Sequence, residues 1–289
     1  MQRQSYQQIL NKLTGLDSWL SSLGLSRQAN RIHLHISNIR QLEKIWQDDT
    51  LKKGLIKKVG HAQLFWSLTE AAEFADVYSA LRNYNNPDLL RKKLQDALKG
   101  SVDPNREASE SNIGRNTMFE LNLASRLFHR GVPVYPQTNP DILCEIDHWK
   151  VYIQCKRPFR EGKISKNISK AYSQLARDLN DSNDKYTRGI IAISVSHVLN
   201  PGDKLFIVKT EHDMMKLLGD HVQRLGERYS RSWKYILDTR IIGISFHLIT
   251  PAVIEKDKLL TVAQQMVTFD RAVNSSDRLL LDRWKHFLG

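Results

Sequence analysis

The sequence predicts an α/β or α+β protein whose first hundred residues form an all-helical N-terminal domain. Three observations support this. Apolar residues recur at three- and four-residue spacing as far as residue 98, a stretch rich in Gly, Pro and small polar residues follows, and helix and strand patterns then alternate. The chain has 289 residues, of which 41% are hydrophobic, enough to bury a substantial core.

Residues 5–98 show successive helical patterns, clearest at Ile32–Trp46, Leu64–Leu81 and Leu89–Leu98. The irregular segment 99–111 places a domain boundary near residue 104. We therefore expect domains at 1–104 and 105–289. The helical domain can bind nucleic acid, recognise a protein partner or support the rest of the chain, and its sequence does not choose between these roles.

The second part of the chain has a mixed pattern that begins with a helix. The predicted helices are Thr117–His129, Ile168–Leu179, Glu211–Leu225 and Ser276–Phe287, and the predicted strands are Asp141–Ile146, Lys150–Lys156, Gly189–Val195 and Ile241–Ile249.

Charge and targeting signals narrow the class of protein. Forty-three Lys and Arg against 31 Asp and Glu give a net charge of +12, which favours a polyanionic partner such as nucleic acid. The N-terminus lacks the order of a signal peptide, and no apolar run is long enough for a membrane span. We expect a cytoplasmic protein without a membrane partner. Cys144 and Cys155 lack CxxC spacing, which indicates reduced, structural thiols.

The helix Thr117–His129 carries one carboxylate among its apolar residues. At about 100° per residue, Glu120 lies near the middle of the apolar arc. The arc consists of Leu121, Leu123, Ala124, Leu127 and Phe128, with Arg115, Asn122, Ser125, Arg126 and His129 on the other side. A buried carboxylate requires an ion pair, hydrogen bonds or a metal. Glu120 is therefore either part of a core salt bridge or part of a site.

The next two strands form a predicted hairpin with a turn at Asp147-His148. If the loop has two residues, Asp141 lies opposite Gln154, about 5 Å away on the same face. Lys156 shares that face because side chains alternate along a strand. The same register places Ile142, Cys144, Ile153 and Cys155 on the opposite, buried face, whereas a three-residue loop would break the pairing.

These residues resemble the PD-(D/E)XK nuclease superfamily, which is also called restriction-endonuclease-like. The matching features are Glu120 on the preceding helix, Pro140-Asp141 at the start of a strand, and Gln154-Cys155-Lys156 in place of (D/E)xK. The QxK variant is similar to Mrr-type restriction enzymes. The resemblance covers residues 112–195 and implies a restriction-endonuclease-like core, with a mixed central sheet flanked by helices.

The resemblance also implies a Mg²⁺ or Mn²⁺ site. Asp141 would hold the ion with the Cys155 main-chain carbonyl and the Gln154 side-chain oxygen, and Glu120 would contribute through a water or a second ion. Lys156 would orient the attacking water. A neutral amide at 154 is a weaker ligand for a hard cation than a carboxylate. Glu145 cannot replace it, because four strand residues span about 13 Å.

The predicted function is thus a metal-dependent nuclease, a phosphodiester hydrolase, with Glu120, Asp141, Gln154 and Lys156 as catalytic residues. DNA is favoured over RNA and endonuclease over exonuclease action. A homodimer would suit double-strand cutting, which often requires two active sites. The alternatives are a catalytically inactive nucleic-acid-binding module on the same fold, and an interaction protein that acts through its N-terminal helices.

Two histidines, three lysines and one glutamine are further candidates for functional residues. His33 and His35 are two residues apart in a helix and so should not face one another as a metal pair. Lys163, Lys166 and Lys170 lie opposite an apolar stripe and form a basic face, whose default interpretation is a solvated surface. Gln174 lies at the edge of that stripe, within possible reach of the site.

Overall fold

A computed structural model describes residues 2–25, 30–48, 62–99, 113–182, 184–201 and 205–288. The chain forms two compact units, each built from more than one segment. Unit 1 comprises residues 1–118, 199–217 and 249–264, and unit 2 comprises 119–198, 218–248 and 265–289. None of the described helices is both long and apolar enough to cross a membrane.

Unit 1 contains the predicted N-terminal helices. They are α1 (Tyr6–Leu13), α2 (Leu16–Ser22), α3 (Asn30–Gln47), α5 (Ala62–Leu81) and α6 (Pro87–Ala97), in agreement with the helical spacing. Ser5 caps α1 through a reciprocal pair of hydrogen bonds with Gln8. Asn86 accepts from the Leu89 amide, and Pro87 occupies the first turn of α6, where no amide hydrogen is required.

Unit 1 also takes in segments from beyond residue 105. Strand β1 (Gln2–Ser5) pairs antiparallel with the start of β8 (Leu259–Asp270), and β6 (Phe206–Val208) pairs with the end of β7 (Ile241–Ile254). Whether residues 1–104 form a domain by themselves stays a prediction, and the predicted boundary segment lies outside the described residues.

Unit 2 is built on a mixed sheet. Three strands, β2 (Val134–Pro136), β3 (Ile142–Ile146) and β4 (Trp149–Lys156), form an antiparallel meander. Helix α8 (Ile164–Ser182) then leads to β5 (Thr187–Ser194), which runs parallel to β4, and β7 continues the sheet parallel to β5. The expected mixed sheet flanked by helices is therefore confirmed.

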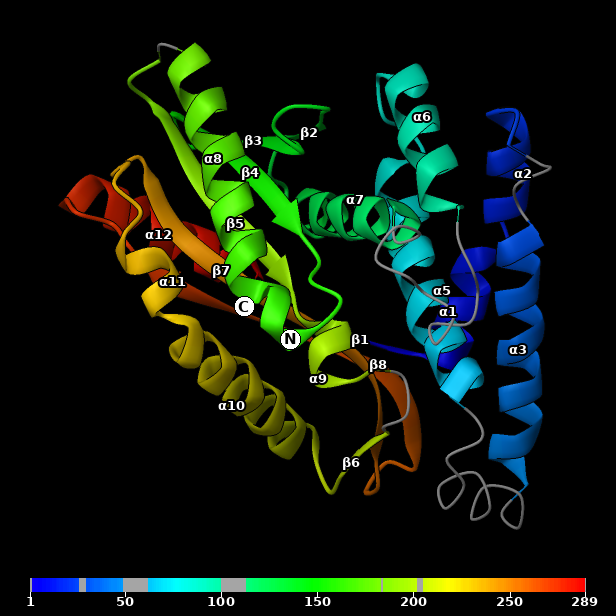
Figure 1. The fold of residues 1–289 in the computed structure, drawn as a ribbon. Helices are drawn as coiled ribbons and strands as arrows, with labels where there is room; N and C mark the ends of the chain where they lie inside the picture. The colour runs from blue at the N-terminus through cyan, green and yellow to red at the C-terminus, as the bar shows by residue number, and fades with distance from the viewer. Residues whose placement is uncertain are drawn as a thin grey trace. The chain divides into compact units, whose positions relative to one another are not determined.

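Helices cover both faces of this sheet. On one face, α8 lies along β4 and β5 (Figure 1), and Leu175 is so close to Gly189 that a Cβ there would lie 2.8 Å from its Cδ2. On the other face, side chains of α7 (Ile113–His129) and α12 (Ser275–Leu288) join the buried side chains of β3 and β4 in one hydrophobic cluster. The two faces of β4 thus have different neighbours.

The remaining predicted helices and strands are present, with ends that differ by a few residues. Helix α10 (Glu211–Tyr229), for example, is longer than predicted, whereas β3 begins at Ile142 and β5 ends at Ser194. Strands β1, β2, β6 and β8 were not predicted, nor were the one-turn helices α9 (Ser196–Leu199) and α11 (Arg231–Lys234).

Candidate metal site on the β3–β4 hairpin

The β3–β4 hairpin has the register that the two-residue turn predicts. Ile146 pairs with Trp149 and Ile142 with Ile153, and continuing this ladder by one step places Asp141 opposite Gln154. Asp147 adopts the left-handed conformation, with φ 55°, that a tight hairpin turn requires. The turn therefore determines which side chains share a face at the far end of the hairpin.

The Asp141 carboxylate is the centre of the candidate site. Its Oδ2 accepts hydrogen bonds from Gln154 Nε2 at 2.5 Å and from the Cys155 main-chain amide at 2.8 Å. Lys156 Nζ lies 3.8 Å from the same oxygen. We call Asp141, Gln154, the Cys155 carbonyl and Lys156 the hairpin site. The structure brings together the three side chains that the sequence placed on one face.

Lys156 also contacts the carbonyl that was predicted as a metal ligand. Its Nζ donates to Cys155 O at 2.8 Å, and only 14% of its side chain is exposed. The ammonium therefore lies between two oxygens that attract positive charge. This is an unusual position for a strand-end lysine, which ordinarily extends into solvent.

The opposite face of the hairpin is apolar, as predicted. Ile142, Cys144 and Ile153 are fully buried, Cys155 nearly so, and all four belong to the core cluster. Both cysteines are free thiols. Burial raises the pKa of the Cys144 thiol far above its usual range, so a reactive thiolate is disfavoured there.

Helix α7 corrects one sequence inference. Arg115, Asn122, Ser125 and Arg126 were placed on a solvent-facing side, but all four are buried, whereas Phe128 from the apolar arc is exposed. Packing therefore covers more than one side of α7. Glu120 is partly exposed, so the argument from its burial does not hold, and its role in the site stays a prediction.

The flank of α8 next to β4 carries polar residues that the sequence reading did not assign to the site. Asp178 occupies a stripe position beside Leu175 and Leu179, and it is 9% exposed. Burial raises the pKa of its carboxyl, Arg177 opposes this shift, and the charges of Asp141 and Asp181 add to it. The argument applied to Glu120, a carboxylate on an apolar stripe, would have found Asp178.

A basic stripe, which we define as Lys163, Lys166, Lys170 and Arg177, follows the outer side of α8 and the short 3-10 helix (Glu161–Lys163) that leads into it. All four side chains are exposed and fall within an arc of about 60° on the helix. Residues 162–177 contain no Asp or Glu. The three lysines form no ion pair with any residue that the structure describes. The predicted basic face is confirmed as an exposed feature.

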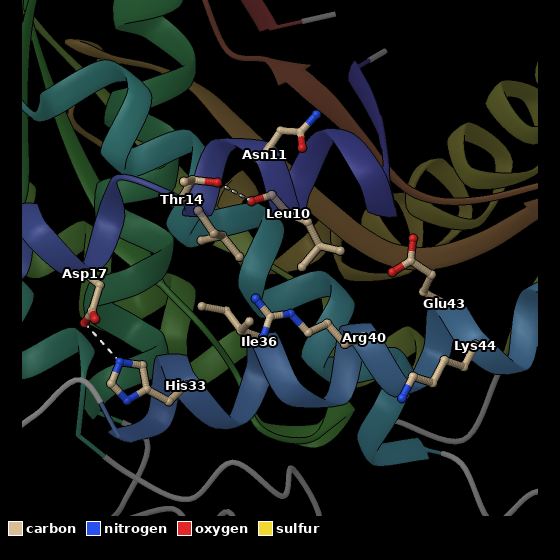
Figure 2. A pocket seen from close by; sticks show the side chains of 10 residues that line it. Leu10, Asn11, Thr14, Asp17, His33, Ile36, Arg40, Glu43 and Lys44 are labelled. Atoms are coloured by element: carbon tan, nitrogen blue, oxygen red, sulfur yellow. Dashed lines mark hydrogen bonds and ion pairs between the residues drawn. The ribbon is translucent and has the colours of Figure 1, made fainter.

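His33 and His35 have different surroundings in the helical part of the chain. His33 is exposed and pairs with Asp17 at 3.0 Å, beside a cavity of about 560 Å³ lined by α1, α2 and α3 (Figure 2). His35 is buried and lies 2.8 Å from Glu70 Oε2.

Glu70 is the centre of a buried ion-pair network in unit 1. Arg31 Nη2 lies 2.5 Å from its Oε2, and Arg115 Nε lies 2.6 Å from its Oε1. Arg31 also donates to the carbonyls of Ala97 and Lys99. The network links four helices, and both Glu70 oxygens are already paired with cationic side chains. We therefore interpret it as structural.

The donor set of the hairpin site fits a hard cation. Within the described part of the chain, no three His, Cys, Asp or Glu side chains are grouped to hold a metal, but the predicted set consists of one carboxylate, one amide oxygen and one carbonyl. Gln154 is 1% exposed, and its Oε1 is buried without a hydrogen-bond partner. Such an oxygen is costly to bury, and a cation would satisfy it.

Comparison of the chain with protein-family models, with curated proteins and with solved structures finds no match.

Proposed function

We propose that this protein is a metal-dependent nuclease of the PD-(D/E)XK type, which hydrolyses phosphodiester bonds in nucleic acid, with DNA favoured over RNA. The observation that carries the proposal is the convergence of Gln154, the Cys155 amide and Lys156 on one carboxylate oxygen of Asp141. Two separate arguments support this group: the motif in the sequence, and the pairing of β3 with β4, which puts Asp141 opposite Gln154.

The order of elements in unit 2 supports the same proposal. A helix precedes a three-strand meander, and a second helix connects it to a parallel strand. The resemblance implies this order of core elements. Endonuclease action and a homodimer are part of the proposal because cutting both strands of a duplex often requires two active sites.

Asp141, Gln154 through its Oε1 and the Cys155 carbonyl would hold Mg²⁺ or Mn²⁺, with Glu120 contributing through a water. When bound, such an ion would supply a more acidic, more nucleophilic water by lowering its pKa towards neutrality. Lys156 would orient that water and offset the charge that develops on the phosphate. The water oxygen would bond to phosphorus and give its proton to solvent, while the ester bond breaks and the departing ester oxygen takes the bonding electron pair and a proton from solvent.

The experiment that tests the function is a cleavage panel. Purified protein is incubated with single- and double-stranded DNA and RNA, with Mg²⁺, with Mn²⁺ or with EDTA. We expect metal-dependent cleavage by the wild type, no product from Asp141→Ala, and a rate lower by on the order of 10²-fold or more for Lys156→Ala.

Matched controls come from the same two strands. Glu145 and Lys150 are exposed and pair with each other near the turn, at the end of the hairpin away from the hairpin site. Glu145→Ala and Lys150→Ala should therefore cleave like the wild type. Cleavage that persists unchanged in Asp141→Ala and Lys156→Ala would exclude the hairpin site as the active site.

The second candidate function is a catalytically inactive module that binds nucleic acid. Gln154 favours it, because a neutral residue stands where the family has an acid, and the basic stripe of α8 offers a binding surface. This candidate predicts salt-sensitive binding without metal-dependent product. Cleavage that requires Lys156 would exclude it.

A further inference from the structure

Three buried oxygens on β4 and on α8, the helix that lies along it, accept no hydrogen bond within the described residues. They are Gln154 Oε1 on β4, and Gln174 Oε1 and Asp178 Oδ2 on α8. All three are acceptors, and Gln174 and Asp178 lie one helical turn apart on the same side of α8. Buried acceptors of this kind require a hydrogen-bond donor or a cation.

Asp178 lies on the side of β4 that carries the hairpin site. It lines a cavity of about 440 Å³ with Pro140, the residue before Asp141, and with Tyr152, which shares the Gln154 face of β4. The carboxyl of Asp178 is therefore on the side of β4 that carries the site.

A core salt bridge does not account for Asp178. The candidate partner is Arg177, whose Nε lies 3.8 Å from Asp178 Oδ1, beyond hydrogen-bonding distance, and whose own side chain is 60% exposed. An exposed pair of this kind contributes little. It leaves Oδ2 without a hydrogen-bond partner among the described residues, and it compensates the burial of the carboxylate only in part.

We propose that Asp178 supplies the second carboxylate of the metal site, beside Asp141, in place of the acid that Gln154 lacks, with the Gln174 amide oxygen in support. The inference rests on the proposed function and deepens it. Hard divalent cations take oxygen ligands, and their affinity rises with the number of charged ligands. The Asp178 carboxylate would supply the negative charge that the neutral Gln154 side chain does not provide.

The test measures metal binding without nucleic acid. The protein, freed of metal, is titrated with Mn²⁺ by calorimetry as wild type, Asp141→Asn, Asp178→Asn and Asp282→Asn. Asp282 is the matched control, since it is an exposed acid on a different helix, α12. We expect Asp141→Asn and Asp178→Asn each to weaken binding by about 10-fold or more, and Asp282→Asn by less than about 3-fold.

A second readout separates a ligand from a structural residue. Without metal, Asp178→Asn should unfold at a temperature no lower than the wild type, because it removes a buried charge. Only the rise in melting temperature on adding Mn²⁺ should be lost. Asp178→Ser is measured in parallel, and loss of the Mn²⁺ response in both variants supports the proposal.

Two results would overturn the inference. If Asp141→Asn abolishes Mn²⁺ binding while both Asp178 variants keep it, Asp178 is not a ligand, and the proposed nuclease site stands without it. If the wild type binds no Mn²⁺, or Asp141→Asn binds as tightly as the wild type, the inference fails together with the metal site on which it rests.

Discussion

Gln154 donates a hydrogen bond from its Nε2 to Asp141 Oδ2 over 2.5 Å, while its buried Oε1 has no hydrogen-bond partner among the residues that the structure describes. The amide thus has two roles. Its nitrogen neutralises part of the Asp141 charge in the absence of metal, and its oxygen remains available to a cation. A glutamate at 154 would bring a second negative charge to within hydrogen-bonding distance of the first.

Gln154→Glu is expected to change metal affinity and stability in opposite directions. Two facing carboxylates repel one another, so the metal-free variant should melt at a lower temperature than the wild type. Bound Mn²⁺ relieves this repulsion, and the dissociation constant should fall by about 10-fold. Calorimetric titration and thermal unfolding with and without Mn²⁺ measure both effects. A variant that binds Mn²⁺ no more tightly would place Gln154 outside the ligand set.

Lys156→Met is expected to separate metal binding from cleavage. The Lys156 ammonium contacts Cys155 O and lies near Asp141, so it repels an arriving cation. Its removal should tighten Mn²⁺ binding while cleavage falls by on the order of 10²-fold. Lys150→Met, at an exposed position on the same strand, should alter neither quantity. Weaker Mn²⁺ binding by Lys156→Met would contradict this division of roles.

Neutralising the lysines of the basic stripe tests whether α8 contacts the phosphate backbone. The Lys163→Gln, Lys166→Gln, Lys170→Gln triple variant should bind duplex DNA less tightly, and the slope of log affinity against log salt should become shallower by up to about 3. Fluorescence anisotropy across a salt series gives both values.

The matched control for that variant removes three exposed lysines elsewhere. Lys209, Lys216 and Lys256 belong to unit 1, and their replacement by Gln lowers the net charge by the same amount. If both triple variants lose affinity equally, the net charge rather than α8 governs binding.

The Glu70 network should make unit 1 sensitive to acid. Burial alone would raise the pKa of Glu70, but Arg31, Arg115 and His35 together hold it well below its usual value of 4.5. A group with a depressed folded-state pKa stabilises the fold above its unfolded pKa, and that stability is lost as the pH falls through the folded pKa. Stability should therefore be retained at pH 5 and decline below about 4.5.

Glu70→Gln should destabilise the protein by about 3–5 kcal/mol at neutral pH, because it leaves two buried guanidinium groups without their counter-charge. Urea unfolding between pH 3 and 7 tests both expectations. Glu43, a partly exposed acid on α3, provides the control: Glu43→Gln should unfold like the wild type. Equal pH profiles for wild type and Glu70→Gln would show that the network does not govern acid stability.

Local patterns were enough to predict the hairpin but not the helix packing. Two polar residues between two alternating runs define a turn, and the turn defines the register of Asp141 and Gln154. Helix α7 was misread because its periodicity identifies one apolar side, whereas neighbours cover a second side and bury Asn122 and Ser125 completely. Burial of polar residues depends on tertiary contacts that no single segment records.

The unpredicted strands have similar explanations. Strand β2 has only three residues and includes Pro136, and β8 contains buried polar residues such as Thr261 and Gln264 that mask its apolar alternation. Asp178 was accessible from the sequence, because it occupies an apolar stripe position on α8. The motif does not include it, because the motif residues after Glu120 lie on or next to β3 and β4 and none lies on α8.

The two-residue turn at Asp147 has a consequence for how the chain tolerates insertions. It lies about 20 Å along the strand from Asp141, on an exposed loop tip where extra residues are ordinarily harmless. Here, one added residue that shifts the strand register by one would exchange the two faces of β4. Gln154 and Lys156 would then face the core, and Cys155 would face the side of the hairpin site. The length of this exposed turn is therefore constrained by the hairpin site at the other end of the strands. Deletion or insertion at the turn should disrupt the site as much as substitution of Asp141 itself.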